Sequence, residues 1–184
     1  MPDWSNAMNT REDFSNLLHA TFLAQPMPAR FFWKENVPDD GYEFCGALLE
    51  WLAQREWTEV KISAWPMSII SISRVHLEPA TFLYYLPALL LGVMEEPEYL
   101  EWALEAIIPS GRDRRPKGRW WGELLETISL DQCAVLRAFL VHVRSAFLRS
   151  DQGPFSITAA EALTSEAETF WDAQILSLRT RMKR

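Results

Sequence analysis

EPATFLYYLPALLLGV, residues 78–93, is the most apolar part of the chain, and it predicts a central helix. Pro79 suits the first helical position, where its missing N–H costs nothing. From Phe82 to Val93 apolar side chains fall on almost every face of that helix, a pattern typical of a buried element. Pro87 lies in the middle, and we expect it to kink or break the helix.

Apolar residues at helical spacing continue on both sides of this segment and predict further helices. Capping boxes at Ser129/Gln132 and at Thr158/Glu161 mark the starts of the last two. The predicted helices cover Arg11–Ala24, Tyr42 to about Gln54, Glu96-Pro97 to the stop at Pro109, Trp120–Ile128, Leu130–Arg149 and about 157–181.

Two short segments, Trp57–Trp65 and Ser68–Ser73, alternate weakly between polar and apolar residues and predict short strands. The other elements are helices, so the predicted fold class is all-α or α-dominated, with a minor short-strand element around 57–73. A chain of 184 residues fits one domain. We therefore expect a single compact multi-helix domain over residues 1–184.

The net charge of −7 disfavours a surface that binds nucleic acid across the whole fold. Cys45 and Cys133 lie far apart among apolar residues, which is typical of reduced, buried thiols. The first residues lack the basic and apolar regions of a signal peptide. Phe82–Val93 is too short to span a bilayer. We therefore expect a cytoplasmic protein with no membrane partner.

The sequence contains no recognised catalytic or cofactor motif. His19, His76 and His142 show no HExxH-like spacing, and neither cysteine lies in a zinc-binding pattern. GxSxG, GxGxxG and P-loop signatures are missing as well. We therefore expect no enzyme, no metal and no cofactor, while an unrecognised carboxylate-based metal site stays open as an alternative.

A run of carboxylates follows the central helix: Glu95, Glu98, Glu101 and Glu105, with Glu96 and Trp102 among them. Glu98, Glu101 and Glu105 would share one helical face. Such a face is most often the solvated side of an amphipathic helix, and the functional alternative is an acidic surface that binds a partner. The first candidate partner-binding residues are Glu95, Glu98, Glu101, Glu105 and Trp102.

Aromatic residues supply the second group of candidates. The chain holds 9 Trp, too many for all of them to lie at the centre of the core. Phe31-Phe32-Trp33 forms a cluster between two predicted helices, and we interpret it either as a lid over the core or as a binding surface. Phe32 and Trp33 are therefore added to the candidate partner-binding residues.

Residues 112–119 carry five basic residues against one acid, and Trp120-Trp121 follows. Basic residues beside aromatic ones can grip phosphates and stack bases, so a nucleic-acid adaptor is one hypothesis. The hypothesis that we favour is a solvated loop whose cations pair with the protein's own acids. Nucleic acid is therefore not an expected partner.

LEPATFLYYLPALLL, residues 77–91, resembles the LTPEAFRYYLPAYL-like signature of a family of uncharacterised bacterial proteins. ISLDQCAVLRAFL, residues 128–140, resembles that family's second motif, and Trp57 matches a tryptophan ahead of the first. The resemblance covers about Trp57–Arg149. Leu83 stands where a basic residue is common in the family, and Pro79-Ala80 replaces Pro-Glu.

The resemblance carries no catalytic residue over to this chain. Small acidic bacterial proteins of this kind often sit beside toxin genes, and the chain looks like the immunity half of a type VI secretion pair with a nuclease toxin. This implies a protein that binds a basic toxin and occludes it stoichiometrically. Acidic residues would steer the encounter and aromatic residues would anchor the contact. Homodimer formation is left open.

Overall fold

Seven α-helices and three short 3-10 helices make up the described part of the chain, residues 11–33, 43–64, 76–146 and 156–183 of a computed structural model. No strand occurs among these residues, so the all-α prediction is confirmed. The α-helices are α1 (Arg11–Thr21), α2 (Glu43–Trp51), α4 (Pro79–Glu95), α5 (Leu100–Ile107), α6 (Arg119–Thr127), α7 (Leu130–Ala146) and α8 (Ser156–Arg181). The 3-10 helices are η2 (Trp57–Glu59), η3 (Ile62–Ala64) and η4 (Pro97–Tyr99).

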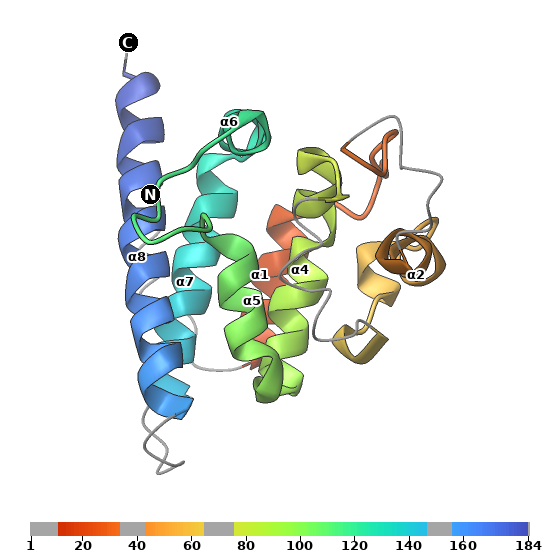
Figure 1. Ribbon diagram of the computed structural model, residues 1–184, viewed down its shortest axis with the longest axis horizontal. Coiled ribbons are helices and arrows are strands. Elements are labelled where there is room, and N and C mark those ends of the chain that lie inside the picture. The colour runs from red at the N-terminus through yellow and green to blue at the C-terminus, as the bar shows by residue number, and fades with distance from the viewer. Residues whose placement is uncertain (1–10, 34–42, 65–75, 147–155, 184) are drawn as a thin grey trace.

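Helix α4 is the centre of the fold (Figure 1). Thirteen of its 17 residues are buried, and α1, α5, α6, η2 and η3 pack around it. The expected break at Pro87 is wrong, because α4 continues through this residue to Glu95. Pro87 removes one backbone hydrogen bond, whereas buried apolar side chains on all sides hold the helix together. Neither α4 nor any other described helix combines the length and apolarity that crossing a membrane requires.

Tyr84 and Tyr85 of α4 tie neighbouring segments to the core through their hydroxyl groups. Tyr84 donates a hydrogen bond to the carbonyl of Ala24, at 2.8 Å. Tyr85 lies within hydrogen-bond distance of the carbonyls of Leu52 and Arg55. These three carbonyls follow the ends of α1 and α2, where no helical N–H is left to bind them. The tyrosine pair therefore has a structural role.

Helices α5, α7 and α8 form the other side of the domain, with α8 along its edge (Figure 1). Helix α7 begins with the predicted capping box. The N–H of Ser129 donates to Oε1 of Gln132 at 2.9 Å, and the N–H of Gln132 donates to Oγ of Ser129 at 3.1 Å. The predicted cap at Thr158 is wrong, because α8 already begins at Ser156 and Thr158 lies within its first turn.

Residues 57–64 do not form a strand. They contain η2 and η3, so the prediction of a short-strand element is wrong here. The weak alternation in the sequence reflects burial instead, since Trp57, Val60 and Ile62 all lie in the core. In a short apolar segment, the spacing of the apolar residues does not distinguish a strand from a helix. The second predicted strand, Ser68–Ser73, lies outside the described residues.

One antiparallel bridge, between Phe32 and Leu77, joins the segment after α1 to the start of α4. Next to it, the N–H of Trp33 donates a hydrogen bond to the carbonyl of His76 at 2.8 Å. This Phe32–Leu77 bridge fixes the position of the aromatic cluster relative to α4.

Candidate functional site

The turn between α4 and α5 carries the predicted carboxylates. Helix α4 ends at Glu95, η4 makes a single turn, and α5 starts at Leu100. Tyr99 and Leu100 are buried and hold this turn against the core. Among the side chains that reach the surface in this turn and at the start of α5, we call four the acidic ridge: Glu96, Glu98, Glu101 and Trp102.

The carboxylates on either side of the acidic ridge are bound within the chain. Arg11 pairs with Glu95, and Arg114 pairs with Glu105 at 3.2 Å. Glu98 and Glu101, in contrast, have no cationic partner among the described residues. Of the four carboxylates predicted to bind a partner, two are therefore neutralised internally and two remain available.

Glu96 joins the available carboxylates, since it too has no cationic partner in the described part of the chain. It was not among the candidate residues because the sequence predicts a helix start there. Burial raises the pKa of Tyr99 above its ordinary value, and the negative charges of Glu96 and Glu98 add to this rise. The acidic ridge therefore produces a local negative potential.

Trp102 is the apolar part of the acidic ridge. Its side chain is 39% exposed, although it follows Glu101 on a helix whose other face is buried. An exposed indole beside unpaired carboxylates can contact an apolar group while the carboxylates bind cations. This arrangement suits a basic protein surface.

Phe32 and Trp33, the other candidate partner-binding residues, do not belong to this surface. They lie at the start of α4, whereas Glu95 is its last residue. A helix of 17 residues separates the two ends by about 25 Å. Both aromatic side chains are half-buried and pack against the core. The interpretation as a lid over the core therefore fits them.

Arg114 is the most strongly bound cation of residues 112–119. It donates to Oε2 of Glu166 at 2.7 Å, and to both carboxylate oxygens of Glu105. Burial opposes its positive charge, but the hydrogen bonds that it donates to Glu105 and Glu166 raise the pKa of Arg114. Arg114 therefore connects α5 to α8.

The same loop contains two further internal pairs. Lys117 pairs with Asp113 at 3.0 Å, and Arg119 pairs with Glu123 at 2.6 Å. The hydrogen bond from Lys117 is the main reason that the pKa of Asp113 is lowered. The favoured interpretation, a loop whose cations pair with the protein's own acids, is confirmed for these cations and for Arg114. Arg112 and Arg115 have no acidic side-chain partner among the described residues.

Residues 10–175 match the model of a protein family described as a family of unknown function, DUF6714. The chain belongs to the DUF6714 family. No curated protein and no solved structure matches it. The matched region includes α1 and most of α8, so it is longer than Trp57–Arg149.

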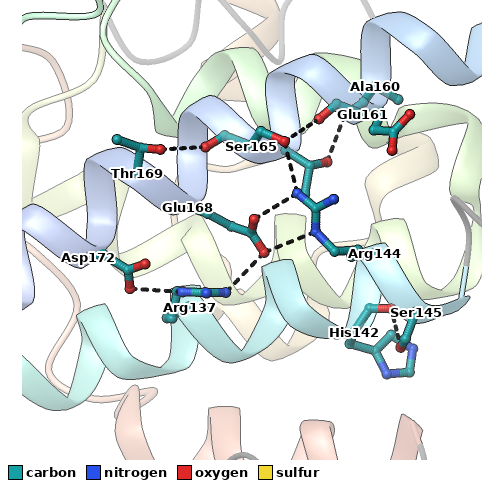
Figure 2. Close-up of polar contacts among 11 residues, drawn as sticks. Arg137, His142, Arg144, Ser145, Ala160, Glu161, Ser165, Glu168, Thr169 and Asp172 are labelled. Carbon is teal, nitrogen blue, oxygen red and sulfur yellow. Dashed lines mark hydrogen bonds and ion pairs between the residues drawn. The ribbon is translucent and has the colours of Figure 1, made fainter.

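In this DUF6714 protein α8 is held to α7 by a ladder of ion pairs, which Figure 2 shows. Arg137 donates to Glu168 at 3.1 Å and to Asp172 at 2.9 Å. Arg144 donates to Glu168 at 2.7 Å and to Oγ of Ser165 at 2.9 Å. Glu168 lies between the two guanidinium groups, with its side chain only 17% exposed. This ladder has a structural role.

Beyond Trp171 the DUF6714 chain presents a second exposed region, since no described residue after it on α8 is buried. Leu176 is 68% exposed and Met182 is 76% exposed. Arg181 and Lys183 have no acidic partner among the described residues. We call these four residues the basic end of α8.

Sequence reasoning also missed a groove of about 470 Å³ where α1, α7 and α8 meet. Leu17, Val135 and Ile175 contribute apolar walls, and Asp131 and Arg179 contribute opposite charges. Its volume lies within the range of ligand pockets. The apolar residues involved follow ordinary helical spacing, so the sequence gives no signal that distinguishes them from core residues.

The described side chains include no group of three or more His, Cys, Asp and Glu residues placed to hold a metal ion. Cys133 is fully buried, and burial raises the pKa of its thiol to about 12. The thiol is therefore protonated at neutral pH and behaves as a small apolar core residue. Cys45 lies where side chains are not described.

Proposed function

We propose that this protein acts by binding a basic protein through the acidic ridge. The observation that carries the proposal is a set of three carboxylates without a cationic partner in the described residues, gathered around a Trp102 that is 39% exposed. Elsewhere the chain uses its arginines to neutralise its acids, as Arg114, Arg137 and Arg144 do. Other exposed acids such as Glu126 also lack a partner among the described residues, but the acidic ridge places three of them within six positions beside an exposed tryptophan.

Each part of the acidic ridge would have its own effect on binding. Unpaired carboxylates at a surface attract a cationic partner over several ångströms and raise the association rate. An exposed tryptophan at the centre of a contact lowers the dissociation rate, since it loses water on binding and packs a large apolar area. Steering and anchoring are therefore assigned to different residues.

The proposed partner is a toxin that this protein neutralises in the cytoplasm by stoichiometric occlusion. The support for this choice is the chain's acidic character together with what its resemblance to a family of uncharacterised bacterial proteins implies, the immunity half of a type VI secretion pair. A nuclease carries a basic surface where it binds nucleic acid, because phosphate contacts need Lys and Arg. An acidic protein that covers this surface would block the substrate without any chemistry of its own.

The test is co-expression with the protein encoded by the neighbouring gene, scored by growth rescue and by co-purification. We expect rescue and a stable complex with the unaltered chain. Glu98→Lys with Glu101→Lys should lower the association rate by roughly tenfold at low salt. Trp102→Ala should mainly raise the dissociation rate.

The matched control is Glu126→Lys, on α6, because Glu126 is exposed and has no partner among the described residues. It changes the net charge in the same direction at a different place. Equal association rates for the control and the double variant would remove the acidic ridge from the proposal. No rescue and no complex with the unaltered chain would reject this toxin as the partner.

A further inference from the structure

The basic end of α8 is a second surface that lacks a partner. Leu176 and Met182 are more than two-thirds exposed, at 68% and 76%. Leu176 and Lys183, seven residues apart, fall on one face at helical spacing, so an exposed apolar group and an unpaired cation lie together at this end of α8. Its charge and its apolar content complement those of the acidic ridge.

The two surfaces cannot meet within one chain. Glu105 of α5 and Glu166 of α8 lie close together, because Arg114 pairs with both of them. From Glu166, α8 continues as one helix to Arg181, over about 22 Å. The acidic ridge lies in the opposite direction, at the start of α5 (Figure 1). A continuous helix cannot fold back over this distance.

We propose that a second copy of this chain provides the partner, so that the basic end of α8 in one copy docks on the acidic ridge of the other. Leu176 and Met182 would pack against Trp102, which supplies exposed apolar surface on the opposite side. Arg181 and Lys183 would lie against the carboxylates of Glu98 and Glu101. The inference rests on the proposed function only in that both use the acidic ridge.

The arrangement of the helices allows two copies to form this contact twice, once in each direction. Helices α5 and α8 run in the same direction, with the acidic ridge and the basic end of α8 at opposite ends (Figure 1). Two copies placed side by side and antiparallel would bring each basic end to the other copy's ridge. A two-fold axis then produces a closed dimer, whereas a head-to-tail arrangement would continue into a filament.

Each contact is a small, largely charged patch, so the dimer should be weak and sensitive to salt. Self-association would also cover the surface assigned to the toxin. Because the basic end of α8 presents cations and apolar groups, it would imitate a basic partner. The toxin would therefore have to displace the second copy, and the free protein would hold its binding surface covered until then.

The experiment is sedimentation of the full chain over a range of concentrations, at low and at high salt. We expect a concentration-dependent dimer at low salt that dissociates at high salt. Arg181→Glu with Lys183→Glu, and separately Glu98→Lys with Glu101→Lys, should each lower the association constant by roughly tenfold or more. The Glu126→Lys control should leave it unchanged.

An equimolar mixture of the two double variants should restore a dimer that contains one copy of each. One of its contacts then joins the reversed basic end to the reversed ridge, and the other joins the two unaltered surfaces. Leu176→Ser, a neutral change at an exposed position, checks the contact without altering the charge at the end of α8, and it should also weaken the dimer. A monomer at every concentration at low salt would overturn the proposal. So would a dimer that is lost in the basic-end variant but kept in the ridge variant, because α8 would then pair with α8.

The two proposals can fail separately. The basic-end variant should bind the toxin no more weakly than the unaltered chain, because its acidic ridge is intact and uncovered. A ridge variant that loses the dimer but binds the toxin normally would reject the proposed function and keep this inference. A basic-end variant that dimerises normally would reject this inference and leave the proposed function in place.

Discussion

Helices α4 and α8 are attached to the same domain in different ways. Thirteen of the 17 residues of α4 are buried, its buried hydroxyl groups bond backbone carbonyls, and its one ion pair among the described residues is Arg11–Glu95 at its last residue. Helix α8 is longer, with 26 residues, but few of its described side chains are buried. They are Ala160, Thr164, Ala167, Phe170 and Trp171. Leu163, Ile175 and Leu178 are partly buried against the core, and three arginines from other elements, Arg114, Arg137 and Arg144, add ion pairs.

This difference separates two sources of stability. A helix surrounded by close-packed apolar side chains responds to changes in volume, and salt has little effect on it. A helix held partly by ion pairs near the surface responds to changes in charge and to ionic strength. Substitutions of equal size should therefore have unequal effects on the two helices.

The largest effect should come from shortening a buried side chain of α4. Leu89 is 1% exposed, so Leu89→Ala leaves a cavity and should lower the free energy of unfolding by about 3 kcal/mol. Leu176→Ala makes the same change on α8 at 68% exposure and should cost less than about 0.5 kcal/mol. Urea denaturation measures both values. Similar losses for the two variants would contradict the comparison.

The next largest effect should come from adding a methyl group to α4. At Gly92 a Cβ atom would overlap Ile62, so Gly92→Ala should cost about 2 kcal/mol. Gly122 in α6 has open space around its Cα, and Gly122→Ala should stabilise the protein by about 0.5–1 kcal/mol. Thermal and urea unfolding measure both changes. A neutral Gly92→Ala would show that η3 can move away from α4 at little cost.

A smaller effect is expected from removing one charge in the α7–α8 ladder. Glu168→Gln deprives Arg137 and Arg144 of their shared carboxylate and should cost about 1–2 kcal/mol at low salt. The loss should shrink in 1 M salt, roughly the concentration at which surface ion pairs are fully screened. Glu126→Gln serves as the exposed, unpaired control. A loss that is independent of salt would assign the role of Glu168 to packing.

The smallest effect should be a dependence of the free energy of unfolding on pH. Burial lowers the pKa of His142, on α7, below its ordinary value of 6.5. The unfolded chain then binds a proton at a higher pH than the folded chain, so stability is complete above about pH 6.5 and falls as the pH decreases below it. His142→Gln should flatten this part of the dependence in urea unfolding at a series of pH values. Identical slopes for both proteins would contradict the assignment.

The sequence predicted the helices well where local chemistry decides the outcome. Pro79 at the start of α4, and the reciprocal bonds of Ser129 and Gln132, depend on residues within one turn of each other. The break at Pro87 was wrong because local propensity was overridden by packing on all sides of α4. The strand at 57–64 was wrong because a short buried segment gives the same pattern in either structure.

The candidate site was only half predictable. Exposed carboxylates near Trp102 could be anticipated from helical spacing, but their pairing depends on residues far away in the chain. Arg11 neutralises Glu95 across 84 positions, and no sequence pattern signals such a contact. Phe32 and Trp33 are a second group of candidates in the sequence, and the length of α4 separates them from the carboxylates. Only the fold shows which charges remain available.

The Phe32–Leu77 bridge has a consequence for how this architecture can change over evolutionary time. Backbone hydrogen bonds join Trp33 to His76 and Glu78 to Phe31, and the chain between these points contributes core residues such as Trp57 and Ile62. A chain segment whose ends are joined by hydrogen bonds can be lengthened without displacing the helices before and after it. Doubling its length costs about 0.6 kcal/mol of closure entropy. A relative could therefore gain or lose residues between these two points, outside the core residues of α2, η2 and η3, while α1 and α4 keep their spacing.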